Sequence, residues 1–236
     1  MVRFLVVAFG VAWPLQFAVA FGIVPAALEL PLLGLAGLAP TLAALACDLR
    51  ALAPLRGPWP LPWIAGAALA PTVLVVVSGL LAGKAPALAA PYLGAVLWPP
   101  LGEEPGWRGF LHRRVSERRG PLVAALLVSG CWAIWHLPTA FYPGADLAAF
   151  PLYAVGVACA GIIMAWAVER TRSLPVAVVA HAGLNGVFVQ RDGGLTSRLI
   201  FLALLGLGVA AAARALARRA APPESERKTW PLASDA

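Results

Sequence analysis

Two adjacent carboxylates and a guanidinium, at Glu103, Glu104 and Arg108, lie within a strongly apolar stretch of the chain. A charged side chain at bilayer depth costs at least about 2.5–3.5 kcal/mol, so these groups should face a protein interior or a wet cavity. Glu104 and Arg108 are four residues apart and share one helix face, while Glu103 points elsewhere. A carboxylate in such a place can exchange protons with water or a ligand. The stretch therefore indicates a functional site, with a structural Glu104–Arg108 ion pair and Glu103 hydrogen-bonded nearby as the alternative.

Pro105 directly follows the two acids and adds an irregularity to the same stretch. Proline has no backbone N–H, so the carbonyl of Leu101 loses its helical hydrogen-bond donor. Within a membrane that carbonyl needs water or a neighbouring donor. We therefore expect the helix to be locally opened beside its acids.

Two of the three histidines, His136 and His181, also lie within apolar stretches. Trp132 precedes His136 by one helical turn, and Asn185 follows His181 by one turn, so each pair shares a helix face. Imidazole can take a proton from water, and imidazole or amide N–H groups can stabilise developing negative charge. Singly, each histidine is more often a hydrogen-bonded core residue. Together with the acids, they indicate a common polar cavity.

The composition is that of an integral membrane protein. Hydrophobic residues make up 61% of the 236 residues and charged residues only 12%, whereas soluble domains have about 25% charged residues. The formal net charge is +7, but the basic residues gather in short loops between apolar stretches, which favours membrane topology over nucleic-acid binding. The three cysteines are odd in number and have no metal-ligand spacing, which argues against a disulfide framework or a zinc knuckle.

The apolar stretches predict an all-α, polytopic membrane protein with about eight transmembrane helices around an intramembrane polar cavity. Gly120 and Pro121 are expected to end the fourth helix and begin the fifth. We expect residues 1–218 to form a single transmembrane domain, with residues 219–236 as a disordered cytoplasmic tail. The predicted spans are residues 2–24, 32–49, 63–82, about 92–119, 122–136, 150–168, 174–189 and 195–216.

The basic residues are distributed unevenly between alternate loops. One side has only Lys84, Arg191 and Arg198, and Arg108 lies within a span. Short cytoplasmic loops carry an excess of Lys and Arg, so both termini are predicted to be cytoplasmic. The other side has the remaining 14 of the 18 basic residues, namely Arg3, Arg50, Arg56, Arg113, Arg114, Arg118, Arg119, Arg170, Arg172, Arg214, Arg218, Arg219, Arg227 and Lys228.

Helix geometry allows the acids and the first histidine to meet. Glu104 and His136 are each 16 residues from Gly120, which corresponds to about 24 Å along two antiparallel helices. His181 lies about 10 Å into its own span, a depth compatible with the same cavity. Three helices are therefore expected to contribute to one site.

These residues resemble the CAAX protease and bacteriocin-processing family of intramembrane proteases, which includes the Rce1-type prenyl endopeptidases. The family motifs are Glu-Glu-x-x-x-Arg, Phe-x-x-x-His and His-x-x-x-Asn. The resemblance covers about residues 92 to 190, and Trp132 stands where the family has Phe. In this chain the motifs read Glu103-Glu104-Pro105-Gly106-Trp107-Arg108, Trp132-Ala133-Ile134-Trp135-His136 and His181-Ala182-Gly183-Leu184-Asn185.

The resemblance implies hydrolysis of a peptide bond in a membrane-embedded protein or peptide. Glu103 and His136 would activate water, and His181 with Asn185 would stabilise the oxyanion. Arg108 would keep Glu104 ionised. The aromatic residues Trp132 and Trp107 are expected to contact the substrate.

The resemblance leaves metal dependence open. Members are often called metalloproteases, and Glu103, His136 and His181 would make a three-ligand zinc set with a free water position. The sequence has no His-Glu-x-x-His motif, and a metal-free mechanism fits equally well, so zinc is possible but no obligatory cofactor is expected. The competing class is a non-enzymatic membrane protein, either a bacteriocin self-immunity protein or a transporter that uses the polar cavity. The absence of repeats weakens the transporter interpretation.

Overall fold

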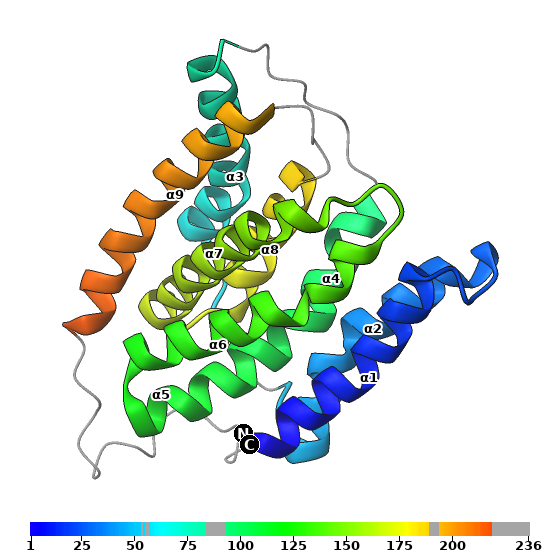
Figure 1. Ribbon diagram of the computed structural model, residues 1–236. Helices are drawn as coiled ribbons and strands as arrows, with labels where there is room; N and C mark the ends of the chain where they lie inside the picture. The colour runs from blue at the N-terminus through cyan, green and yellow to red at the C-terminus, as the bar shows by residue number, and fades with distance from the viewer. Residues whose placement is uncertain (53, 55–56, 84–92, 189–193, 219–236) are drawn as a thin grey trace.

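The computed structural model describes residues 1–218 except 53, 55–56, 84–92 and 189–193, and this part of the chain is all-helical (Figure 1). The predicted tail at 219–236 lies outside the described residues. The π-helix is η2 (Pro105–His112), and the 3₁₀-helices are η3 (Leu137–Phe141) and η4 (Leu147–Ala149). The α-helices are α1 (Val2–Ala20), α2 (Ala26–Cys47), α3 (Leu61–Leu81), α4 (Leu93–Glu104), α5 (Arg113–Arg119), α6 (Pro121–Trp135), α7 (Phe150–Thr171), α8 (Leu174–Phe188) and α9 (Gly194–Ala217).

The helices agree with the predicted polytopic membrane fold. Because α4, η2 and α5 follow one another without a break, the described residues form eight helical spans, as predicted. The apolar part of α8, Leu174–Asn185, is shorter than a full span. Within the part of the chain that the structure describes, six segments are long and apolar enough to cross a membrane, namely Val2–Ala20, Ala26–Cys47, Leu61–Leu81, Pro121–Phe141, Leu147–Thr171 and Leu199–Ala217.

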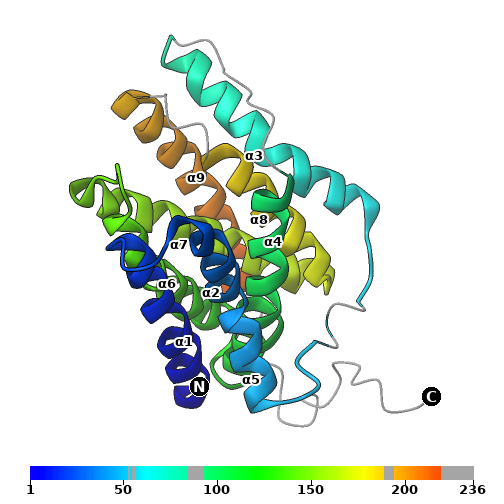
Figure 2. The same cartoon turned by 90° about the vertical axis from the view of Figure 1, so that its right-hand side faces the viewer.

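The helix that carries the acids lies in the middle of the bundle. The α1–α2 hairpin packs on one side of it, and α3 and α9 lie at the opposite side of the molecule, where α3 contacts α8 and α9 (Figures 1 and 2). Within the bundle, α4 packs against α2 and α8, while η2 contacts α2, α5, α6, α7 and α8. This central position removes the charged side chains from lipid.

The local opening expected at Pro105 is present as a π-helix that begins at this residue and continues to His112. Every residue of η2 is buried. π-Helical segments are rare and occur frequently at functional sites. At the far end of α5, Gly120 adopts φ +83°, a conformation that favours glycine, and Pro121 begins α6.

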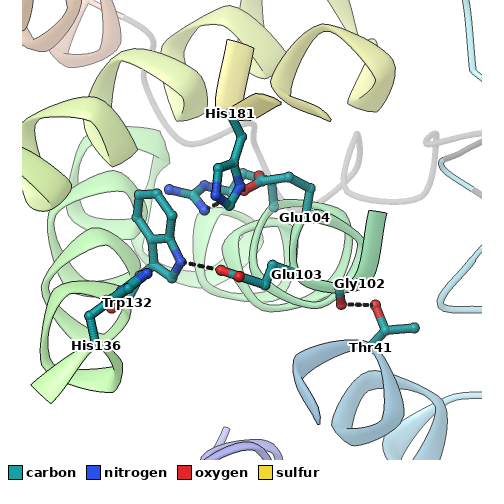
Figure 3. A network of polar contacts seen from close by, with 8 residues as sticks. Thr41, Gly102, Glu103, Glu104, Trp132, His136 and His181 are labelled. Carbon is teal, nitrogen blue, oxygen red and sulfur yellow. Dashed lines mark hydrogen bonds and ion pairs between the residues drawn. The ribbon is translucent and has the colours of Figure 1, made fainter. Parts of the chain in front are cut away.

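Glycines on one face of the central helix allow its backbone to pack closely against α2. A Cβ atom on Gly102 would lie 2.6 Å from the carbonyl oxygen of Gly37, and a Cβ atom on Gly106 would overlap the backbone of Pro40. Thr41 also donates a hydrogen bond from Oγ1 to the carbonyl of Gly102, at 2.5 Å (Figure 3). Small residues allow membrane helices to approach this closely. With Gly102 and Gly106 against α2, the two glutamates are directed elsewhere.

We expect Gly106→Ala to destabilise the protein by about 1–3 kcal/mol or more, because the added methyl group overlaps the backbone of α2, which cannot move aside as a flexible side chain can. The measurement is a thermal melt in detergent. Gly130→Ala is the matched control, since a Cβ at Gly130 meets no atom within 4 Å. Equal melting temperatures for the two variants would contradict the close contact between η2 and α2.

Contacts at the two ends of the bundle show which helix ends lie on the same face of the molecule. At one end Arg114 pairs with Asp48 at 2.9 Å, and Ser116 donates to Glu169 at 3.1 Å, so the ends of α2, α5 and α7 lie together. At the other end Phe141 packs against the ring of Phe17 at the end of α1. The ends of α2, α5 and α7 therefore share one face of the structure, and the ends of α1 and η3 share the other.

Candidate active site

The two adjacent glutamates leave the central helix in different directions (Figure 3). Glu103 points toward α6, where its Oε2 accepts a hydrogen bond from the indole Nε1 of Trp132 at 2.7 Å. Glu104 points toward α8, where its Oε1 lies 2.8 Å from Nδ1 of His181. Both carboxyl groups are buried, with 3% of Glu103 and 0% of Glu104 exposed. The site thus has two halves: Glu103 contacts Trp132 of α6, and Glu104 contacts His181 of α8.

His136 is oriented by the backbone of its own helix end. Its Nδ1 lies 2.7 Å from the carbonyl oxygen of Trp132, which can only accept a hydrogen bond, so the proton is on Nδ1. The neutral ring then has an unprotonated Nε2 that can accept a proton. The rings of His136 and Trp132 also meet edge to face at 5.2 Å. Trp132 therefore connects Glu103 to His136 through its side chain and its carbonyl.

Arg108 connects this half of the site to the other. Its Nη1 donates to Oε1 of Glu104 at 2.9 Å, and its Cζ lies 4.2 Å from the centre of the Trp132 ring. The predicted ion pair between Glu104 and Arg108 is thus present and fully buried. The structural alternative, a Glu104–Arg108 ion pair with Glu103 hydrogen-bonded nearby, agrees with these contacts, and the same carboxylate oxygen of Glu104 also lies 2.8 Å from Nδ1 of His181.

His136 and His181 line one small cavity, whereas the expected acids, Glu103 and Glu104, are not among its lining residues. Its volume of about 20 Å³ is enough for one or two water molecules. The polar groups of His136, His181 and Asn185 face apolar side chains of α7 and α8 across it. The cavity is lined by Trp132, His136, Tyr153, Val157, Ala160, His181, Leu184 and Asn185.

Trp107, which was expected to contact the substrate, lies in the packed interior of the bundle, and its contact with substrate stays a prediction. Trp107 is 0% exposed, and its ring packs edge to face against Phe4 at 5.4 Å and Trp135 at 6.3 Å. It does not line the cavity. The reason is that the side chain of Trp107 is directed into the aromatic contacts between η2, α1 and α6, where it contributes to packing.

The α7 residues that line the cavity have no distinctive pattern in the sequence. Tyr153, Val157 and Ala160 recur at intervals of four and three residues, which is also the spacing of ordinary core residues in an apolar helix. Tyr153, whose ring lies 5.9 Å from that of His136, was the only one of them with a polar group that could have served as a signal.

The candidate zinc ligands are not placed around one point. Among the described residues no group of three or more His, Cys, Asp or Glu side chains could hold a metal ion. Glu103 reaches the histidines only through Trp132, whose ring lies 5.2 Å from that of His136 and 5.1 Å from that of His181. In this arrangement Glu103, His136 and His181 do not fit a three-ligand metal site.

The described residues form a polytopic helical bundle with two buried acids beside a small cavity that is lined by two imidazoles and an amide. Residues 85–187 match the family of type II CAAX prenyl endopeptidases described as Rce1-like. This part of the chain is therefore an Rce1-like domain of the CAAX protease and bacteriocin-processing family, as the motifs predicted. The match includes all three motifs. No curated protein matches the chain. Membership implies an intramembrane protease with protein substrates.

Proposed function

We propose that the chain hydrolyses a peptide bond in a membrane-associated protein or peptide, with Glu103 and His136 on one side of the reacting carbonyl and His181 and Asn185 on the other. The observation that carries the proposal is the separation of the two glutamates. Glu103 is joined to His136 through Trp132, and Glu104 is joined to His181 directly. One half can therefore activate water while the other stabilises charge.

Water activation is assigned to Glu103 and His136. Glu103 has one oxygen on Trp132 and a second oxygen that can orient a water molecule, while Nε2 of His136 is free to accept. As the water oxygen attacks the carbonyl carbon, its proton passes to one of these two groups and then to the leaving amine when the C–N bond breaks. The products are a carboxylic acid and an amine.

Oxyanion stabilisation is assigned to His181 and Asn185, which line the same cavity. When Nδ1 of His181 donates to Glu104, its Nε2 can donate to the oxyanion only in the doubly protonated form of the ring. The carboxylate of Glu104, itself held by Arg108, lies 2.8 Å from Nδ1 of His181 and orients its ring. The amide of Asn185 supplies a further donor to the developing charge.

The proposal includes no obligatory metal. Cleavage in a strong zinc chelator is therefore expected to continue at the rate seen without it. Complete loss that zinc restores would instead make Glu103, His136 and His181 metal ligands.

The proposed activity is tested by comparing the membrane peptidomes of cells with the protein, without it, and with its Glu103→Gln form. We expect peptides that depend on the intact protein and are absent in the other two samples. Identical peptidomes in all three would favour the non-enzymatic alternatives, a self-immunity protein or a transporter.

We further propose that the face formed by α5 and the ends of α2 and α7 is cytoplasmic, with both chain termini on that side. In intact cells, a cysteine introduced as Arg119→Cys, at an exposed end of α5, should be shielded from an impermeant thiol reagent. The matched probe Ile23→Cys, exposed in the turn between α1 and α2, should react. Both are made in a background without native cysteines. The reverse pattern would contradict the orientation.

A further inference from the structure

The second nitrogen of the Arg108 guanidinium is directed into the contact between α6 and α7. Nη2 has no hydrogen-bond partner among the described residues, although Arg108 is only 2% exposed. A Cβ atom on Gly161 of α7 would lie 2.8 Å from this nitrogen and 2.5 Å from Oγ of Ser129 on α6. Real Cβ atoms are essentially never closer than 3.0 Å to such atoms. The guanidinium therefore occupies space that exists because residue 161 has no side chain.

The space beside Gly161 is occupied by the Arg108 side chain, which contacts both halves of the site. From this position Nη1 of Arg108 reaches Glu104, which in turn contacts His181. The face of the same guanidinium covers Trp132, which holds Glu103. A guanidinium pushed out of the α6–α7 contact could not keep both contacts, because its planar group sets their relative directions.

We infer that Gly161 is a positioning residue for the reaction, because it leaves room for Nη2 of Arg108 between α6 and α7. Arg108 held in this place contacts Trp132, which binds Glu103, and Glu104, which contacts His181. The two halves of the site are thereby aligned with each other. The inference rests on the proposed function. It assigns a role to a residue outside all three motifs and outside the cavity wall.

A purely structural role makes a different prediction. Gly161 could be needed only so that α7 can approach Ser129, whose Cβ would be 2.7 Å from an added Cβ atom. In that case a side chain at 161 would harm the protein whatever residue occupies position 108. If Gly161 instead serves Arg108, the harm depends on the guanidinium.

The test is a double-mutant cycle between Gly161→Ala and Arg108→Lys, made throughout in a Ser129→Gly background that removes the contact with Ser129. Lysine has no Nη2, so it leaves the space beside residue 161 open. With Arg108 present, we expect Gly161→Ala to lower kcat about 10²-fold, since small misplacements of catalytic groups have effects of this size, while KM changes less than about twofold. With Arg108→Lys, the further loss from Gly161→Ala should be less than about threefold.

Gly156→Ala on the same helix is the control, because a Cβ there would make an ordinary 3.4 Å contact with Leu202. It should leave kcat unchanged. If Gly161→Ala prevents folding, thermal melts carry the test: folding restored by Arg108→Lys supports the inference, and misfolding in both backgrounds overturns it. If the wild type is active and Gly161→Ala lowers kcat equally with Arg108 and with Lys at position 108, or does not lower it at all, the inference about Gly161 is overturned while the proposed function stands. A wild type that cleaves no substrate overturns the proposed function, and the inference with it.

Discussion

Glu103→Gln protein is expected to fold normally and to turn over substrate about 10²–10⁴-fold more slowly than the wild type, the contribution typical of general acid–base catalysis. The glutamine oxygen can still accept the hydrogen bond from Trp132, so the contact at 2.7 Å is kept. The amide cannot take a proton from water, so the chemical step is lost. The measurement is cleavage of an identified substrate by purified protein in nanodiscs, with a thermal melt to verify folding.

Glu29→Gln is the matched control, since this acid lies in the first turn of α2, away from the site, and its variant should keep wild-type turnover. The same assay applies to the partners of Glu103. If the groups act as one unit, His136→Ala and His181→Ala should each reduce turnover almost as far as the triple variant that combines both with Glu103→Gln. Asn185→Ala should be milder, at about 10²–10³-fold, as one donor among several. Folded Glu103→Gln protein with undiminished cleavage would remove Glu103 from the mechanism.

Glu104→Gln is expected to fail in a different way, by losing about 3–5 kcal/mol of stability as well as activity. Glu104 is fully buried and is the ion-pair partner of Arg108, so the substitution leaves a buried guanidinium without the carboxylate that it directly contacts. It also weakens the contact that orients His181. The measurement is the melting temperature of Glu104→Gln beside that of Glu103→Gln in the same detergent.

A double replacement separates the two effects of Glu104. In Glu104→Leu/Arg108→Met both charges are gone, and replacing a whole buried pair with apolar residues is often neutral or stabilising. We expect this variant to recover much of the stability lost by Glu104→Gln and none of the activity. Equal melting temperatures for Glu104→Gln and the wild type would show that the buried ion pair does not stabilise the fold.

The layout of the bundle could be predicted because each of its signals is local in sequence. Apolar stretches of span length and the break at Gly120 and Pro121 mark the helices, and the four-residue spacing of Glu104 and Arg108 already implies their ion pair. The equal distances of Glu104 and His136 from Gly120 placed the acids near α6, where Glu103 bonds Trp132.

The partners of individual side chains could not be predicted in the same way, because helix spacing gives a face but not the neighbour that fills it. Trp132 was expected as an aromatic wall and is also the hydrogen-bond donor to Glu103. Trp107 belongs to the same motif as the acids yet packs against Phe4 in the core. The role of Gly161 depends on a contact between three helices, which no local pattern reveals.

Solvent oxygen gives the most direct test of peptide hydrolysis at this site. Purified protein is incubated with its substrate in water enriched in oxygen-18, and the fragments are analysed by mass spectrometry. The proposed mechanism predicts one oxygen-18 atom in the new C-terminal carboxyl group of the wild-type product, and a rate of formation of this fragment that is about 10²–10⁴-fold lower with folded Glu103→Gln protein. Fragments without the label, or labelled fragments formed equally well by Glu103→Gln, would contradict water activation by this site.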